Sequence, residues 1–296
     1  IDVINNFPYQ DIRDYYAKWY RTDLQGIIIV GDINVDEIEA KLKKVFADVK
    51  APVNPAERIY YPVADNQEPL IYIGTDKEVK NPSVNIFFKQ DATPDSMKNT
   101  IAYYATQYML SMAMNMLNNR LNELSQTANP PFTSAGAGYG EFFLAKTKEA
   151  FSLSAGSKID GIDLAMKTVL EEAERARRFG FTATEYERAR ANYMQAVESA
   201  YNEREKTKSS AYVDEYVNNF LDKEPIPGIE FEIYACQPDG TEHSGRCNQQ
   251  VYATANHRQQ SSGSACRPRE RRREISQQGR NRSPAERDEV IRPETI

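Results

Sequence analysis

The sequence predicts an α+β fold in which long helices cover an antiparallel sheet. Short runs alternate apolar and polar residues, as strands with one buried face do, and longer runs repeat apolar residues every three or four positions, as amphipathic helices do. Their order along residues 68–235 is strand, strand, long helix, strand, strand, helix, helix. Strands that follow one another directly favour an antiparallel sheet over a doubly wound parallel one.

The first fifty residues predict a helix, a strand and a second helix. Residues 8–21 begin with a proline and continue with aromatic and apolar residues at helical spacing. Residues 25–30 are rich in β-branched side chains and predict a buried strand, and residues 35–49 place their apolar residues on one helical face. Residues 50–67 are rich in proline and have no periodicity, which predicts a linker.

Residues 68–235 predict one larger domain. The predicted strands are residues 70–74, 84–89, 132–145 and 149–157, and the predicted helices are residues 95–125, 162–179 and 182–222, the last with a break. Gly180 is placed to end one helix, and Thr182 with Glu185 forms a capping box that starts the next. We therefore expect a sheet of at least four antiparallel strands under these helices.

The composition excludes several classes of function from the first 235 residues. The net charge of −6 gives no electrostatic footprint for nucleic acid, and no run of 18 apolar residues predicts a transmembrane segment. The histidines and cysteines all lie beyond residue 235, at His243, His257, Cys236, Cys247 and Cys266. A zinc site of the usual ligands, a histidine-activated nucleophile and a redox pair are therefore excluded from residues 1–235.

The last segment, residues 236–296, differs in composition from the rest. No leucine follows Asp222, and arginine, glutamine and serine dominate the end of the chain. This predicts an anomalous tail that is disordered, and we attribute it to a shift of reading frame near codons 235–250. Codons permitted for residues 267–284, read one nucleotide later, can encode APEKEGEKYPSKEEIAAL, an acidic linker followed by a capped amphipathic helix.

Three stretches form an ordered set of motifs. They are the tract from Tyr15 to Phe46, which contains YAKWYRTDL and IIIVGDINVDEIEAKLKKVF, then NNRLNELSQ (residues 118–126) and RRFGFTATEYERARANY (residues 177–193). Together they resemble the pitrilysin/insulinase family of inverzincin zinc metallopeptidases. The resemblance covers roughly residues 7–234.

The resemblance implies a module of two similar α+β domains of the mitochondrial-processing-peptidase-like metallohydrolase type. It assigns residues 1–50 to the tail of a preceding metal-binding domain, residues 51–67 to a linker and residues 68–235 to the non-catalytic domain that follows. The family's catalytic His-x-x-Glu-His helix would then lie upstream of Ile1, so the preceding domain is only partial here. Neither this motif nor its His-Glu-x-x-His relative occurs in the sequence. We therefore expect no catalytic or metal-ligating residue in this chain and no activity from it alone.

The resemblance also suggests where a substrate would bind. The family places arginine and tyrosine on the chamber wall that faces the zinc, which makes Arg120, Phe132 and Tyr139 the candidate substrate-binding residues. The alternative for Arg120 is an ordinary ion pair on the helix surface with Glu123 or Glu203. The small residues of 133–143 could let an extended substrate backbone approach a sheet edge.

A second group of charged residues, at positions 171–178, predicts an exposed helix surface and not a binding site. Its glutamates alternate with arginines at helical spacing, which predicts a solvated helix face and not a set of catalytic carboxylates.

Two functions remain open at this point. In the first, the chain is a fragment of a zinc metalloendopeptidase and supplies the non-catalytic wall of its peptide-binding chamber. In the second, it is a metal-free scaffold or partner subunit of the same family. Both imply a peptide substrate and a catalytic domain in cis or in trans, and zinc is implied only for the full-length protein. The resemblance allows a bacterial cell envelope or periplasm without deciding the compartment.

Overall fold

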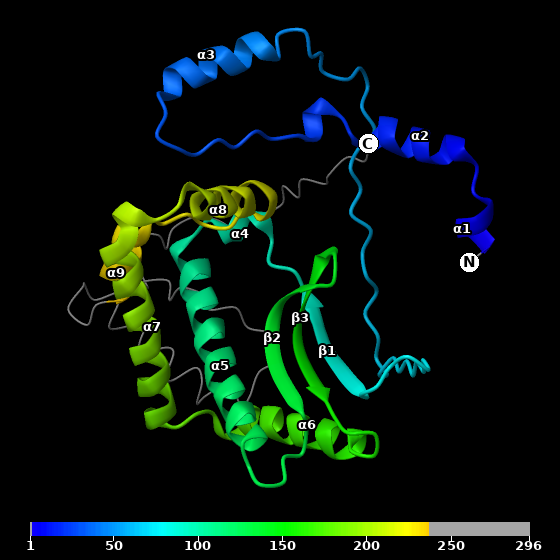
Figure 1. Cartoon of the computed structure of the whole chain (residues 1–296), viewed down its shortest axis with the longest axis vertical. Coiled ribbons are helices and arrows are strands. Elements are labelled where there is room, and N and C mark those ends of the chain that lie inside the picture. The colour runs from blue at the N-terminus through cyan, green and yellow to red at the C-terminus, as the bar shows by residue number, and fades with distance from the viewer. Residues whose placement is uncertain (1, 237–296) are drawn as a thin grey trace, which may run out of the picture. The chain divides into compact units, whose positions relative to one another are not determined.

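The computed structural model describes residues 2–236, and the predicted tail lies outside them except for Cys236, the last residue of a helix. Its first part contains four short helices, α1 (Asp2–Asn6), α2 (Tyr9–Trp19), the 3-10 helix η1 (Thr22–Leu24) and α3 (Val35–Val45) (Figure 1). The helices predicted within residues 8–21 and 35–49 are confirmed. Asn34 caps α3 by accepting a hydrogen bond from the Glu37 backbone N–H at 3.3 Å. None of these helices buries a residue.

The strand predicted for residues 25–30 is wrong. These residues have no regular structure, and Ile27 and Ile29 are 56% and 47% exposed. A strand exists only where a neighbour completes its ladder of backbone hydrogen bonds, and no described strand lies alongside these residues. The β-branched residues favour a strand, but no strand within residues 2–236 pairs with them.

The sheet has three antiparallel strands in the order β1-β3-β2. They are β1 (Ser83–Asp91), β2 (Ser134–Phe142) and β3 (Ala145–Gly156), and β2 and β3 form a hairpin. In the central strand Leu153 lies between Ile86 of β1 and Ala137 of β2. The prediction of at least four strands is therefore wrong, because residues 70–74 have no regular structure.

The remaining helices follow the predicted order up to residue 222, and α9, after it, was not predicted. They are α4 (Asp95–Lys98), α5 (Ile101–Ser125), α6 (Ile162–Phe179), α7 (Ala183–Glu203), the 3-10 helix η2 (Arg204–Lys206), α8 (Ser209–Asp222) and α9 (Ile229–Cys236). The single helix predicted for residues 95–125 is two, because Thr100 caps a new start by accepting from the Tyr103 N–H at 3.2 Å. The predicted break within residues 182–222 is confirmed at η2.

The core lies between one face of the sheet and the helices α5 and α6. Its buried members are Leu117, Leu121, Phe132, Leu153, Ala155, Ala165 and Val169. A second cluster joins α5 to α7 through Met112, Met116 and Ala189. The α+β prediction is confirmed, and both clusters depend on α5, which places that helix at the centre of the domain.

Candidate substrate-binding site

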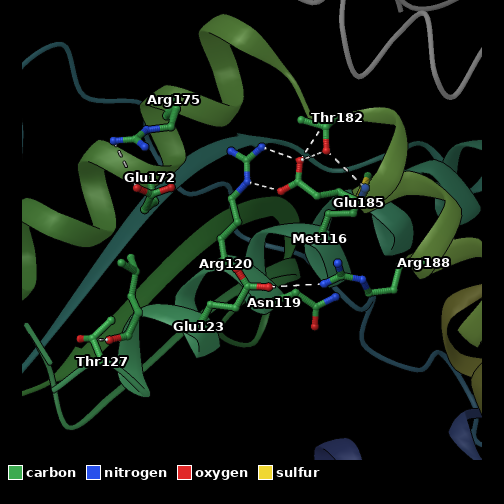
Figure 2. Close-up of a pocket in the computed structure, with 11 residues that line it drawn as sticks. Met116, Asn119, Arg120, Glu123, Thr127, Glu172, Arg175, Thr182, Glu185 and Arg188 are labelled. Atoms are coloured by element: carbon green, nitrogen blue, oxygen red, sulfur yellow. Dashed lines mark hydrogen bonds and ion pairs between the residues drawn. The ribbon is translucent and has the colours of Figure 1, made fainter.

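A pocket of about 550 Å³ opens where α5, α6 and α7 meet (Figure 2). It is lined by Met116, Asn119, Arg120, Glu123, Leu124, Thr127, Glu172, Arg175, Thr182, Glu185 and Arg188. Apart from Met116 and Thr127, these residues come from α6 and from two of the motifs identified in the sequence, residues 118–126 and residues 177–193. The fold therefore brings together stretches that lie about sixty residues apart in the chain.

Arg120 of α5 is held tightly in this pocket. Its Nε donates to Glu185 Oε1 at 2.5 Å, and its Nη2 donates to Glu185 Oε2 at 2.9 Å and to the Gly180 carbonyl at 3.1 Å. The guanidinium also lies over the Phe181 ring at 4.7 Å, a cation–π contact. The ion pair with Glu123 or Glu203 considered for Arg120 is not formed, and Glu185 takes that place.

Glu185 serves two structural purposes at once. Its carboxylate accepts from Arg120 and from the Thr182 backbone N–H at 2.7 Å, while the Thr182 hydroxyl accepts from the Glu185 N–H. The predicted capping box at the start of α7 is thus confirmed. The hydrogen bond from Arg120 is the main cause that lowers the pKa of Glu185 to about 2, and the Thr182 bonds add to it. The same contact raises the pKa of Arg120.

The other charges of the pocket are also paired. Arg188 lies 3.4 Å from Glu123, and Arg175 lies 3.5 Å from Glu172. Each lining arginine therefore faces a glutamate, so the pocket has no excess positive charge. One donor remains, because Arg120 Nη1 is buried and has no hydrogen-bond partner among the described residues.

The solvated face predicted for residues 171–178 is partly wrong. Arg177 and Arg178 pair with Glu174 on the surface as expected, but Glu172 is buried at 8% exposure. Glu172 points toward the pocket because α6 turns this side of its surface to α5.

The three candidate substrate-binding residues do not meet at one place. Of Arg120, Phe132 and Tyr139, only Arg120 lines the pocket. Phe132 is 3% exposed and packs in the core, where its ring is not accessible to a ligand. The Tyr139 hydroxyl donates to Glu149 at 2.5 Å on the helix-covered side of the sheet and accepts from Gln90.

Asn118 was not predicted from the sequence as a functional residue, and its side chain forms hydrogen bonds with the outer edge of β2. Its side-chain amide accepts from the Ala137 N–H at 2.8 Å and donates to the Ala137 carbonyl at 2.9 Å. Asn118 thus bonds to β2 as a neighbouring strand would, at the edge where a substrate backbone was expected to approach. An amide next to the buried Leu117 of α5 was the available signal, because buried polar groups require a partner.

Comparison with known proteins decides the family. Residues 6–193 match the family model described as the peptidase M16 inactive domain. The chain belongs to the M16 peptidase family. This confirms the resemblance to the pitrilysin/insulinase group.

Curated M16 relatives are zinc proteases by name. The chain is 28% identical over 231 residues to a zinc protease PQQL-like protein of Arabidopsis thaliana, covering 78% of this chain and 21% of that protein. It is 27% identical over 128 residues to the probable zinc protease PqqL of Haemophilus influenzae, covering 42% of this chain and 13% of that protein. The chain thus spans about a fifth or less of the length of these relatives.

Solved M16 structures share the fold. The periplasmic protease PqqL of Escherichia coli aligns with a TM-score of 0.63 at 18% identity, over 86% of this chain and 27% of that one. A predicted insulinase family protease of Yersinia pestis aligns with a TM-score of 0.57 at 12% identity, over 82% of this chain and 52% of that one. At these identities the likeness establishes the fold alone.

The zinc implied by the M16 family does not fit the residues at hand. Residues 2–236 contain no histidine, and among them no group of three or more acidic or cysteine side chains is placed to hold a metal ion. Both histidines lie outside the described part of the chain. No helix between residues 2 and 236 is long and apolar enough to cross a membrane.

Proposed function

We propose that this chain supplies the non-catalytic wall of the peptide-binding chamber of an M16 zinc metalloendopeptidase. The observation that carries the proposal is the match of residues 6–193 to the M16 inactive domain. In this proposal residues 1–50 complete a preceding metal-binding domain, residues 51–67 link the two, and residues 68–235 form the wall. Zinc and the water that it polarises would come from the partner domain.

The contribution of this chain would then be binding and not chemistry. Arg120 lines the α5–α6–α7 pocket with one buried donor not used within the described chain, which would suit a peptide carbonyl or carboxylate. The Asn118 amide argues against strand addition along the middle of β2, because it already bonds that edge.

We also propose a cellular compartment from the same relatives. The E. coli relative is a periplasmic protease, which supports a bacterial periplasm for the full-length protein. Its substrates would be peptides or oligopeptides, bound in part by this chain and cleaved only in the presence of the catalytic domain.

The first test uses the chain alone. We expect purified chain to carry no stoichiometric zinc after incubation with zinc and removal of the excess, and to leave oligopeptides uncleaved. Elemental analysis measures the bound zinc, and mass spectrometry of the peptides measures their cleavage. One tightly bound zinc per chain, held by residues 1–235, would contradict the proposal.

The second test separates the peptidase from a metal-free partner subunit. The gene is sequenced upstream of the codon for Ile1. A His-x-x-Glu-His helix in the same frame supports the zinc peptidase. If the upstream region encodes an M16 domain without this motif, the zinc peptidase is excluded and the metal-free scaffold is supported.

The third test addresses Arg120 as a peptide contact. Binding of fluorescent oligopeptides to the chain is followed by anisotropy, for the natural sequence and for Arg120→Lys. The substitution keeps the charge but removes the forked donor, so we expect about tenfold weaker binding. Arg13→Lys on the exposed α2 is the matched control, and circular dichroism verifies the fold of both variants. Equal affinity for all three proteins would exclude Arg120 from the peptide site.

A further inference from the structure

The connection between the first helices and the sheet is held at two points. Residues 50–82 lie between α3 and β1 and contain no helix or strand. The prolines and the missing periodicity of residues 51–67 predict a linker there. Side chains on both sides of this linker bind its two ends, and they leave only its middle without a partner.

The first point of attachment is Arg21, in the turn after α2. Its Nη1 donates to the Ala56 carbonyl at 2.8 Å, and its Nε lies 3.2 Å from Asp23 Oδ1. Only 9% of the Arg21 side chain is exposed. Next to it, the Thr22 hydroxyl donates to the Lys50 carbonyl at 3.2 Å. Because a guanidinium removed from water is costly to leave unpaired, Arg21 holds the start of the connection against this turn.

The second point of attachment is Lys148 of β3. Its ammonium lies 2.6 Å from Asp65 Oδ1 of the connection and 2.7 Å from Asp91 Oδ1 of β1, the residue opposite it in the ladder. Only 6% of the Lys148 side chain is exposed, whereas both aspartates face solvent. A buried ammonium needs acceptors for its three N–H groups, so this ion pair holds the connection more firmly than a pair of exposed charges would.

Two further contacts hold the residues next to Asp65. The Val63 N–H donates to the Thr147 hydroxyl at 3.3 Å, and the Lys89 ammonium donates to the Ala64 carbonyl at 2.8 Å. Three consecutive residues of the connection are therefore each bonded to a different side chain of β1 or β3. Residues held in this way have lost the backbone freedom of a flexible linker.

Between the two points of attachment lie residues 57–62. None of the hydrogen bonds or ion pairs within residues 2–236 involves them, and the contact of Arg58 with the Tyr60 ring, at 5.0 Å, joins two residues of the segment itself. Tyr61 is 79% exposed. This segment is therefore the part of the linker that neither region holds.

Residues 66–82 form a closed loop and not a second point of movement. They begin beside Asp65, which is bound to Lys148, and they end at Ser83, the first residue of β1. Both ends of this loop therefore move with the sheet, whatever conformation the loop takes. The mechanical path from the first helices to the sheet runs through residues 57–62.

We propose that residues 57–62 are the hinge between the two regions and that Arg21 and Lys148 are the clamps that define it. A chain extends by at most about 3.3–3.6 Å per residue, so this hinge reaches about 20 Å, whereas the whole of residues 51–67 would reach about 60 Å. The clamps thus keep the two regions on a short tether and leave their relative orientation free. The inference rests on the contacts of this chain and does not depend on the proposed function.

Backbone ¹⁵N relaxation by NMR on the full chain tests the position of the hinge. We expect order parameters below about 0.6 for the amides of residues 57–61 and near about 0.85, the value of a rigid backbone, for those of residues 63–65. Residues 63–65 that are as mobile as residues 57–61 would overturn the proposal. Residues 57–61 that are as rigid as β1 and β3 would overturn it equally.

Two substitutions in the connection test the clamp at Lys148. Asp65→Ala removes the acceptor, so we expect the order parameters of residues 63–65 to fall to about 0.6. Glu57→Ala is the matched control, because it removes an exposed carboxylate that pairs with nothing within residues 2–236. The amides of β1 and β3 report in both variants that the sheet is folded. An unchanged value at residues 63–65 in Asp65→Ala, or an equal fall in Glu57→Ala, would overturn the clamp.

Arg21→Ala tests the other clamp. It frees the Ala56 carbonyl, so the order parameters of residues 54 and 56 should fall to those of the hinge. Arg13→Ala, on the exposed face of α2, is the control and should leave them unchanged. The same order parameters in Arg21→Ala as in the natural sequence would show that Arg21 does not hold the connection and would overturn the proposal.

Discussion

Residues 2–49 and residues 83–222 are built from similar amphipathic elements but differ in what those elements contact. α6 buries Ala165 and Val169 completely against α5 and the sheet. α3 has an equally regular apolar stripe, yet it buries no residue, and Val45 is 67% exposed. The difference teaches that a periodic pattern fixes the type of element, whereas burial requires a partner surface.

The strands make the same point. Residues 84–90 and residues 25–30 both carry β-branched or aromatic side chains. The first set forms β1 because β3 lies beside it, and the second has no strand beside it among residues 2–236. We therefore regard residues 83–236 as a domain with its own core and residues 2–50 as elements whose apolar faces are not covered within residues 2–236.

The largest expected effect is at the ion pair that joins α5 to α7. Arg120→Ala leaves the partly buried Glu185 without its bidentate partner and removes the contact with Phe181, so we expect a loss of about 3 kcal/mol in the free energy of unfolding. Urea unfolding measures it. Arg13→Ala, on the exposed face of α2, should change the value by less than about 0.5 kcal/mol. Similar losses at the two sites would remove the distinction between the regions.

A second comparison makes one chemical change in two helices. Val169→Ala in α6 removes fully buried methyl groups and should cost about 2 kcal/mol. Val45→Ala in α3 removes exposed ones and should be neutral within about 0.5 kcal/mol, because alanine also favours the helix slightly. Urea unfolding of both variants is the measurement. A cost above about 1 kcal/mol at Val45 would mean that α3 is packed in solution.

A smaller effect is expected from acid. The folded pKa of Glu185, about 2, lies below its ordinary value of 4.5. Its contribution is therefore present above pH 4.5 and is lost as the pH falls toward 2. Between pH 5 and pH 3.5 this loss amounts to about 1 kcal/mol. Glu185→Gln should be less stable at pH 7 but lose about 1 kcal/mol less over that interval, as measured by urea unfolding at each pH. Parallel pH profiles would contradict the role of Glu185.

Much of the fold was predictable because its signals are local. The capping box at Thr182, the end of α6 at Gly180 and the alternation of β3 each depend on neighbours within a few residues. The strands predicted for residues 25–30 and 70–74 were not found, because pairing depends on a partner elsewhere. The start of a separate helix at Thr100 was not predicted, because the residues on both sides of Thr100 favour a helix.

The site was less predictable than the fold. The motif around Arg120 pointed to the right helix, but its true partner, Glu185, lies 65 positions away on a different helix. No local spacing encodes that contact. The burial of Phe132 and the bonding of Asn118 to Ala137 likewise depend on how α5 packs against the sheet.

Limited proteolysis of the full chain tests the central claim most directly. If residues 83–236 form a self-supporting domain and the apolar faces of residues 2–50 stay uncovered, the first cuts fall between residues 2 and 82. A resistant fragment then remains that contains the strands β1 to β3 and the helices α4 to α9, and mass spectrometry identifies its ends. First cuts within α5, α6 or the β2–β3 hairpin, or equal resistance of the first fifty residues, would contradict the account.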